Sequence, residues 1–237
     1  MQIAVVIPAY NEEQSIEKVV ESVHQAAAKY NLILTPVVVN DCSKDATGDI
    51  ISKINCVAIH LPVNLGIGGA VQTGMKYAFV NKFDYAVQMD GDGQHPAKEL
   101  IKLLECAKNE NADVVIGSRF ISGEGFQSSF MRRIGIRFFS KLIKILTGYK
   151  IADTTSGYRL FNRKALELID EYYPDEYPEP EAIIYFSKSN LKVVETPVKM
   201  QERQGGVSSI GFYASIYYML KVSLALIFTY IRLYKRN

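Results

Sequence analysis

Three short apolar runs, each followed by a polar loop, constrain the fold of this chain more than any other feature. They occupy residues 3–7, 36–39 and 57–61. Apolar residues at helical spacing follow the first run, behind the candidate helix caps Asn11 and Ser15. Continuous apolar strands suit the middle of a parallel sheet, because helices cover both faces of such a sheet. The alternation predicts an α/β fold with a mainly parallel sheet flanked by helices.

A fourth strand-forming run, at residues 84–90, ends in the sequence Gly-Asp-Gly-Gln-His-Pro. Asp90 and Asp92 stand one residue apart there, so both carboxylates can face one cleft. Carboxylate oxygens bind Mg²⁺ or Mn²⁺, which keep water and substrate phosphates as further ligands. Gly91 allows close approach of the backbone to a ligand, and Gln94 adds a neutral oxygen. The run therefore predicts a metal and phosphate site, with an ordinary solvated turn as the alternative.

The ends of these runs should meet at one edge of the sheet. In an open α/β sheet, ligands bind outside the carboxyl ends of the strands. The polar side chains expected to converge on this crevice are Tyr10, Glu12, Asp41 and Asp92. Their separation in the sequence then has no bearing on their proximity in space.

Four motifs in a fixed order resemble the inverting family-2 glycosyltransferases, which have the nucleotide-sugar-binding GT-A fold. They are Pro-Ala-Tyr-Asn-Glu at 8–12, Asn-Asp-Cys-Ser-Lys-Asp at 40–45, Asp-Gly-Asp at 90–92 and Gly-Ser-Arg at 117–119. Two further segments, 153–159 and 203–208, are most similar to the polyprenyl-phosphate sugar transferases of the dolichyl-phosphate mannose synthase type. The resemblance covers roughly residues 1–210 and implies a Rossmann-related GT-A sheet that binds a nucleotide sugar.

Carried onto this chain, the resemblance implies a donor site. Pro8, Tyr10 and Glu12 would flank the nucleoside, and Asp41 would hydrogen-bond the edge of the base. The residues implied to bind ribose, diphosphate and metal are Asp90, Gly91, Asp92 and Gln94. A UDP-linked donor is preferred, although Asp41 can pair with the ring N–H of either uridine or guanosine.

The resemblance also implies an acceptor side. The residues that it matches to acceptor binding are Arg119, Arg132 or Arg133, Thr155 and Ser156. The arginines would bind the acceptor phosphate, and the two hydroxyls would be available to a phosphate or a sugar. Arg203, ahead of the Gly-Gly pair at 205–206, resembles a residue of a mobile loop that closes over the donor diphosphate. Asp92, Arg119 and Arg203 are therefore expected to take part in catalysis.

The chemistry required depends on the acceptor. A polyprenyl phosphate is anionic at neutral pH, so the enzyme need only align it and stabilise the leaving diphosphate. A sugar hydroxyl of a glycan needs a carboxylate to take its proton. The candidates lie in Tyr-Pro-Glu-Pro-Glu at 177–181, and we choose Glu181 as this base. A glutamate in the first turn of a helix, stabilised by the helix dipole, is the alternative interpretation.

Composition excludes some classes of function. The net charge of only +2 over 237 residues argues against a nucleic-acid-binding protein. The three cysteines lack metal-ligand spacing and cannot all pair, which favours a reduced, cytoplasmic setting. The presence of both Asp90 and Asp92 speaks against a catalytically silent nucleotide-binding scaffold subunit, which is the remote alternative.

Two segments predict contact with a membrane surface. Residues 131–146 alternate basic and apolar residues at helical spacing, which is typical either of a helix on anionic lipid or of a solvated face over a core. The basic residues are Arg133, Arg137, Lys141 and Lys144. Residues 212–233 are nearly long enough to span a bilayer, but Lys221 and the many tyrosines favour an interfacial helix. A spanning helix and a buried helix or oligomer contact are the alternatives.

We therefore expect a GT-A catalytic domain at residues 1–210 and a membrane-associated helix at residues 211–237. The expected function is metal-dependent, inverting transfer of a hexose or a related sugar from a nucleotide sugar to a polyprenyl phosphate at the cytoplasmic face of the membrane. The alternative enzyme extends a cell-surface polysaccharide or another glycan at a hydroxyl. A separate membrane protein as anchor and a homo-oligomer are left open.

Overall fold

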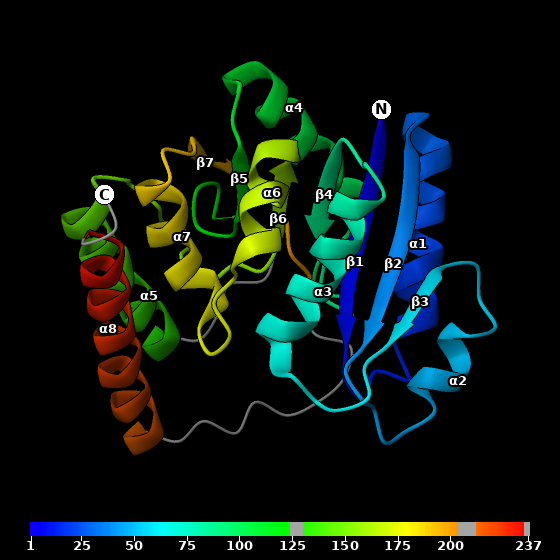
Figure 1. Cartoon of the computed structure of the whole chain (residues 1–237), viewed down its shortest axis with the longest axis horizontal. Coiled ribbons are helices and arrows are strands. Elements are labelled where there is room, and N and C mark those ends of the chain that lie inside the picture. The colour runs from blue at the N-terminus through cyan, green and yellow to red at the C-terminus, as the bar shows by residue number, and fades with distance from the viewer. Residues whose placement is uncertain (124–129, 203–211, 235–237) are drawn as a thin grey trace.

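The computed structural model describes residues 1–123, 130–202 and 212–234 of the chain. The described strands form one seven-stranded sheet in the order β3-β2-β1-β4-β6-β5-β7 (Figure 1). Their bounds are β1 Gln2–Ala9, β2 Ile33–Asn40, β3 Val57–His60, β4 Tyr85–Gln88, β5 Val114–Ser118, β6 Arg159–Asn162 and β7 Val193–Pro197. Neighbouring strands are parallel except at β6, which is antiparallel to β4 and β5. The prediction of a mainly parallel sheet is confirmed.

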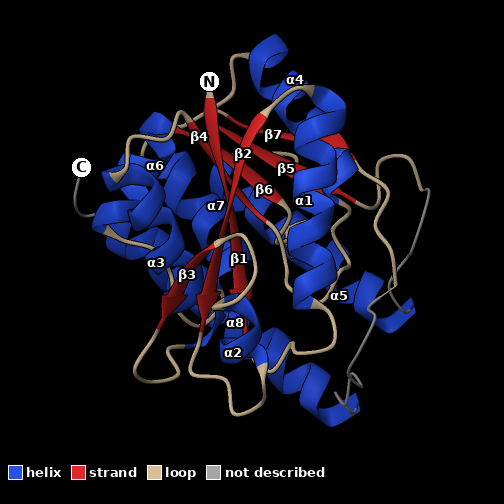
Figure 2. Ribbon diagram, turned by 90° about the vertical axis from the view of Figure 1, so that its right-hand side faces the viewer, coloured by secondary structure: helices blue, strands red, loops and turns tan. Residues whose placement is uncertain are grey.

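Helices cover both faces of the sheet (Figure 2). Their bounds are α1 Ile16–Tyr30, α2 Thr47–Ile51, α3 Gly66–Val80, the 3₁₀ helix η1 Ala97–Glu99, α4 Leu100–Glu110, α5 Phe130–Thr147, α6 Arg163–Glu171, α7 Pro178–Lys188 and α8 Phe212–Tyr234. One core cluster lies between the sheet and α1, α2 and α4. The other joins the opposite face to α3, α5, α6, α7 and α8.

The buried first strand shows why the apolar runs predict a central position. Along β1, Ala4 and Val6 pack into one core cluster, and Ile3, Val5 and Ile7 pack into the other. Successive side chains of a strand point to opposite faces, so a strand between two helix layers must be apolar at every position. The sequence of β1 meets that requirement, and its carboxyl end leads directly into the loop that begins at Tyr10.

Two local details shape the start of α1 and the packing of α3. Ser15 occupies the N-cap position of α1, but its hydroxyl donates to Glu12 Oε2 at 2.9 Å and accepts no helix N–H. On α3, a Cβ added at Gly74 would lie 2.3 Å from Val6 Cγ1. The absence of a side chain at Gly74 therefore lets α3 approach β1 closely, which places the start of α3 beside the carboxyl ends of the strands.

The C-terminal helix α8 packs on α7 and α5. Val222, Leu226 and Leu233 join the same core cluster as those helices. Lys221, which interrupts the apolar sequence, pairs with Glu176 at 3.1 Å. Among the described helices, none combines the length and the apolarity that a membrane span requires. The division of the chain into a domain at 1–210 and a helix at 211–237 stays a prediction.

Candidate active site

A pocket of about 470 Å³ lies where the carboxyl ends of β1, β2 and β4 meet the start of α3. The residues that line it are Pro8, Ala9, Tyr10, Glu12, Asp41, Asn64, Gly66, Ile67, Ala70, Asp90, Gly91, Asp92 and Glu179. The structure thus brings together every side chain that the sequence places in the donor crevice except Gln94. The parallel sheet explains this convergence, because its strands deliver their following loops to one edge.

Asp41 lines the pocket and fixes the turn before α3. Its two carboxylate oxygens accept hydrogen bonds from the N–H groups of Leu65 at 2.7 Å and Gly66 at 2.9 Å. Gly66 has a positive φ of 76°, a conformation that suits glycine. Each carboxylate oxygen can accept a second hydrogen bond, so this turn also presents Asp41 to a ligand. The predicted contact with a base edge stays a prediction.

The loop after β1 is tied to the loop after β2, which fixes the approach to the pocket. The N–H of Glu12 donates to Thr47 Oγ1 at 2.8 Å, and the N–H of Lys44 donates to Asn11 Oδ1 at 2.8 Å. Tyr10 begins the first of these loops and lines the pocket, and 43% of its surface is exposed. An exposed aromatic ring held on a fixed loop can stack on a planar base.

The turn that carries the paired aspartates is held by backbone hydrogen bonds. Asp92 Oδ1 accepts from the N–H of Gln94 at 2.9 Å, and the carbonyl of Gln94 accepts from the N–H of Gln201 at 3.0 Å. Asp90 and Asp92 line the pocket, but Gln94 does not. Gln94 therefore supports the turn through its backbone, and its predicted role as a metal ligand stays untested.

A divalent metal fits the pair of carboxylates in this pocket. Mg²⁺ and Mn²⁺ prefer oxygen ligands, and Mg²⁺ is held in many enzymes by one or two carboxylates together with substrate phosphates and water. Asp90 and Asp92 provide such a pair. Within the described ranges, no group of three or more His, Cys, Asp or Glu side chains could hold a metal alone. Any metal here would rely on the substrate for its remaining ligands.

His95 is a component of this turn to which the sequence analysis gave no role. Its ring is buried and stacks on Tyr158, with a centroid distance of 4.8 Å and an interplanar angle of 9°. The N–H of Asp90 donates to His95 Nδ1 at 3.0 Å. Burial lowers the pKa of His95 to about 4, so the ring is neutral near pH 7 and carries its hydrogen on Nε2. His95 thereby anchors the backbone of Asp90.

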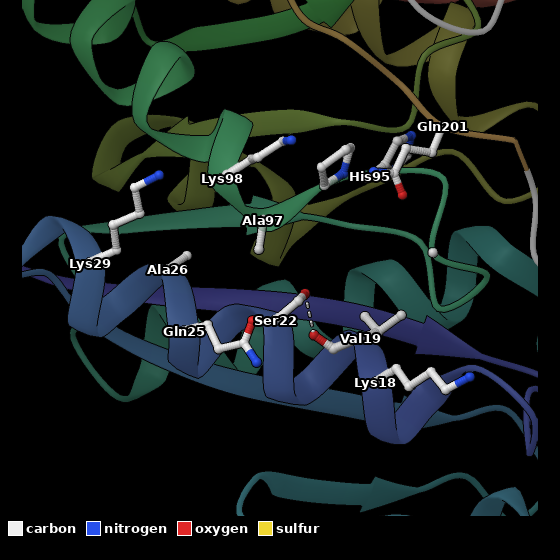
Figure 3. A pocket seen from close by; sticks show the side chains of 12 residues that line it. Lys18, Val19, Ser22, Gln25, Ala26, Lys29, His95, Ala97, Lys98 and Gln201 are labelled. Atoms are coloured by element: carbon white, nitrogen blue, oxygen red, sulfur yellow. Dashed lines mark hydrogen bonds between the residues drawn. The ribbon is translucent and has the colours of Figure 1, made fainter.

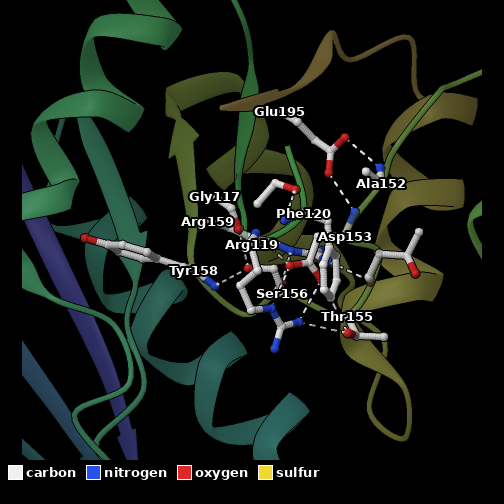
Figure 4. Close-up of polar contacts among 12 residues, drawn as sticks. Gly117, Arg119, Phe120, Ala152, Asp153, Thr155, Ser156, Tyr158, Arg159 and Glu195 are labelled. Atoms are coloured by element: carbon white, nitrogen blue, oxygen red, sulfur yellow. Dashed lines mark hydrogen bonds and ion pairs between the residues drawn. The ribbon is translucent and has the colours of Figure 1, made fainter. Parts of the chain in front are cut away.

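Arg119 lies in a buried ion pair with Asp153 (Figure 4). Its Nε and Nη2 donate to the two carboxylate oxygens, each at 2.7 Å, and its backbone N–H donates to Oδ2 at 3.1 Å. Nη2 also donates to Thr155 Oγ1 at 3.1 Å. Arg119 does not line the pocket. In this structure it joins the end of β5 to the 153–157 loop, and its predicted contact with an acceptor phosphate stays a prediction.

Three other residues expected on the acceptor side, Arg133, Thr155 and Ser156, are also absent from the pocket lining. The Ser156 hydroxyl is buried and donates to the carbonyl of Gly117 at 2.6 Å. Arg133 lies on α5 and is half-buried. The side chain of Arg132 and all of Arg203 lie outside the described residues.

The two glutamates at the start of α7 point in different directions. Glu181 Oε2 accepts a hydrogen bond from the Thr229 hydroxyl of α8 at 2.8 Å, and burial raises the pKa of Glu181. Glu181 does not line the pocket, whereas Glu179 does. The structure therefore brings Glu179, rather than the predicted Glu181, to the side of Asp90 and Asp92.

A group of buried polar atoms lies behind Asp90, and the sequence analysis missed it. Within the described part of the chain, the buried atoms without a hydrogen-bond partner are both amide atoms of Gln88, Thr154 Oγ1, Arg159 Nη1 and the Tyr173 hydroxyl oxygen. Gln88 and Arg159 are opposite each other on β4 and β6. A Cβ at Gly157 would lie 3.0 Å from Gln88 Nε2 and 3.2 Å from Asp90 Oδ1. Gly157 therefore leaves room for Asp90 above this group.

Comparison with known proteins identifies the class and then the family. Residues 4–169 match the glycosyl transferase family 2. The chain is 31% identical over 217 residues to UDP-N-acetylglucosamine–dolichyl-phosphate N-acetylglucosaminyltransferase of Methanococcus voltae, covering 83% of this chain and 84% of that protein. It is also 31% identical to polyprenol monophosphomannose synthase of Mycolicibacterium smegmatis, over 87% of this chain and 80% of that protein. The protein is a glycosyltransferase. It belongs to glycosyl transferase family 2.

A solved structure shows the same fold at low identity. Glucosyl-3-phosphoglycerate synthase from Mycobacterium tuberculosis, crystallised with Mn²⁺, UDP and phosphoglyceric acid, superposes with a TM-score of 0.68 at 18% identity. The superposition covers 98% of this chain and 78% of that one. At this identity the likeness shows the fold, and the fold agrees with the GT-A arrangement that the motifs imply.

Proposed function

We propose that this glycosyltransferase transfers a sugar from a nucleotide-sugar donor, preferably UDP-linked, to a polyprenyl phosphate, with inversion and with a divalent metal. One observation carries the proposal: Tyr10, Asp41, Asp90 and Asp92 line a single pocket at the carboxyl edge of the sheet. The pocket lining combines an exposed aromatic ring, the Asp41 carboxylate and the paired residues Asp90 and Asp92. Relatives of matching length that act on dolichyl phosphate or polyprenol support the lipid acceptor.

These pocket residues bind different parts of the donor. Tyr10 stacks on the base and Asp41 accepts a hydrogen bond from its ring N–H. Asp90 and Asp92 hold Mg²⁺ or Mn²⁺, which when bound neutralises charge on the leaving diphosphate. The lipid phosphate supplies an oxygen that is already negatively charged, so its attack on the anomeric carbon requires no base from the protein.

Incubation of the purified protein with Mn²⁺ and a panel of radiolabelled nucleotide sugars tests the donor assignment. We expect slow hydrolysis of the donor in the absence of any acceptor. Sugars linked to one nucleoside diphosphate should be hydrolysed faster than sugars linked to the others. If no nucleotide sugar is bound or hydrolysed, the donor assignment is wrong.

A second function, transfer to a glycan hydroxyl, is favoured by the position of Glu179. This carboxylate lines the same pocket as Asp90 and Asp92, where it could take a proton from an attacking hydroxyl. Glu181 would need to turn away from Thr229 to do the same.

Glutamine substitutions at Glu179 and Glu181 distinguish the two acceptors. With polyprenyl phosphate, we expect Glu179→Gln to lower kcat/KM by less than about tenfold, because no proton has to be removed. A hydroxyl acceptor would make the loss about 10²-fold or more. Glu181→Gln is the matched control, since Glu181 bonds to Thr229 outside the pocket. A large loss confined to Glu179→Gln, with recovery by added formate, would make the glycan hydroxyl the acceptor.

We also propose that the protein lies peripherally on the membrane through α5 and α8. On α5, Arg137, Lys141 and Lys144 are exposed beside exposed apolar side chains. The exposed apolar residues of these two helices are Ile134, Phe138, Ile145, Leu220, Leu224, Ile227, Phe228 and Ile231. Basic residues attract anionic lipid and apolar ones insert at the interface. A separate anchor protein, a homo-oligomer and the cytoplasmic location stay predictions.

Vesicle co-sedimentation tests this surface. Because Val222 and Leu226 of α8 are buried in the core, point substitutions are preferable to deletion of the helix. The double variant Leu224→Gln/Phe228→Gln should bind anionic vesicles several-fold more weakly than the wild type. Wild-type binding should also fall steeply with salt, since each basic residue contributes about 1 kcal/mol near anionic lipid.

The matched control for co-sedimentation is Val63→Gln/Val80→Gln, which changes two equally exposed apolar residues far from α8 in the sequence. Its vesicle binding should equal that of the wild type. Equal binding by neutral and anionic vesicles, or an unchanged Leu224→Gln/Phe228→Gln variant, would show that α5 and α8 do not form the membrane contact.

A further inference from the structure

A second groove, of about 340 Å³, lies between α1 and the segment that follows β4 (Figure 3). Its lining includes Lys18 and Lys29 of α1, Lys98 of η1, and His95 and Gln201. None of the described residues that line it is an aspartate or a glutamate. This lysine groove is therefore a concave surface with cationic side chains and no compensating carboxylate in its wall.

The lysines are distributed along the groove. Lys18 and Lys29 are about three helical turns apart on α1. In Figure 3, Lys29 and Lys98 stand on facing walls toward one end, with Lys18 and Gln201 toward the other. A lysine ammonium on a flexible stem reaches inward from a rim. The arrangement suits an anion with more than one negative charge better than a single carboxylate.

His95 supplies a second and independent indication of a ligand. Its side chain is only 5% exposed. Because Nδ1 accepts the N–H of Asp90, the ring hydrogen lies on Nε2, and this N–H has no partner among the described residues. His95 lines the groove, and its Nε2 is not among the fully buried atoms that lack a partner. A ligand in the groove can therefore reach this N–H, and an anion bound there would accept it.

The lysine groove and the donor pocket share one wall. Asp90, Gly91 and Asp92 line the donor pocket, whereas Gly93, His95 and other residues of the same turn line the groove. The two cavities thus adjoin along a single short segment. The groove has no lining residue in common with the donor pocket.

We propose that the lysine groove binds a small phosphate-bearing anion, at a site distinct from the donor pocket. Lys29, Lys98 and Lys18 neutralise its charge, and His95 Nε2–H donates a hydrogen bond to one of its oxygens. The volume suits an anion between pyrophosphate and a mononucleotide in size. Charge-assisted hydrogen bonds of this kind are the stronger ones in proteins. The proposal extends beyond the transfer reaction and does not depend on the identity of the acceptor.

Calorimetric titration with inorganic pyrophosphate in metal-free buffer tests the proposal. Without metal, Asp90 and Asp92 repel pyrophosphate, so the donor pocket should not bind it. The wild type should bind one pyrophosphate per chain. The double variant Lys29→Gln/Lys98→Gln should bind it at least about tenfold more weakly, because two charge-assisted contacts are lost. The matched control Lys53→Gln/Lys76→Gln removes the same charge from exposed lysines outside both cavities and should bind like the wild type.

A separate titration with UDP and Mn²⁺ shows whether the sites are distinct. The wild type and Lys29→Gln/Lys98→Gln should bind UDP equally. No pyrophosphate binding by the wild type, equal weakening in both double variants, or loss of UDP binding with Lys29→Gln/Lys98→Gln would each overturn the proposal. If UDP does not bind to the wild type while pyrophosphate does, the donor assignment fails and the groove remains.

Discussion

Replacement of Asp92 by asparagine should lower sugar transfer by about 10³-fold while leaving the fold intact. The change removes one of the two carboxylate charges that hold the metal against the leaving diphosphate, a contact of roughly 4 kcal/mol in the transition state. Asparagine has the same shape, and its Oδ1 can still accept the N–H of Gln94 that Asp92 accepts at 2.9 Å. Steady-state transfer rates at saturating Mn²⁺, with a circular dichroism melt, measure the two effects separately.

The control for Asp92→Asn is Asp84→Asn. Asp84 precedes β4, at the opposite end of the strand, and accepts the N–H of Gln2 at 2.7 Å. Asp84→Asn makes the same chemical change far from the pocket and should keep full activity. Substantial transfer by Asp92→Asn, or by the wild type in excess chelator, would show that the reaction does not require the metal.

Replacement of Arg119 by methionine should destabilise the protein by about 3–5 kcal/mol, because the carboxylate of Asp153 would be left buried without its partner. Asp153 is fully buried and makes two side-chain hydrogen bonds to Arg119. The double variant Arg119→Met/Asp153→Asn should be more stable than Arg119→Met, since it buries no unpaired charge. Urea unfolding of the three proteins measures this coupling.

Urea unfolding and transfer assays of the same three proteins together separate two roles for Arg119. If Arg119 mainly binds the acceptor phosphate, Arg119→Met will unfold near the wild-type urea concentration and lose transfer activity alone. If it is mainly the anchor of the 153–157 loop, stability and activity will fall together and the double variant will recover part of both. We expect the second result, because Arg119 does not line the pocket.

The sheet and the location of the donor pocket could be predicted because they depend on local patterns and one general rule. Each apolar run is long enough for a buried strand, and the rule for open α/β sheets then collects Tyr10, Asp41, Asp90 and Asp92 at one edge. The pairing of Arg119 with Asp153 could not be predicted in this way. It depends on β6 entering the sheet antiparallel between β4 and β5, and no local pattern specifies that insertion.

The choice between Glu179 and Glu181 shows how a small shift in a helix start changes a functional assignment. From the sequence we consider only Glu181 for the first turn of a helix, but α7 begins at Pro178. Both glutamates are therefore in the first turn, and two residues along a helix rotate a side chain by about 200°. Glu179 consequently reaches the pocket and Glu181 reaches Thr229.

The role of His95 was missed because its stacking on Tyr158 depends on where the segment before β6 lies in the fold.

The central claim is transfer to a lipid phosphate, and one comparison of acceptors tests it most directly. Purified protein, Mn²⁺ and the preferred radiolabelled nucleotide sugar are incubated with either polyprenyl phosphate or the corresponding polyprenol, and the products are extracted into organic solvent. We predict labelled lipid only with polyprenyl phosphate, at a rate that Asp92→Asn lowers by about 10³-fold. Equal labelling of polyprenol, or no labelled lipid with polyprenyl phosphate, would contradict the proposed acceptor.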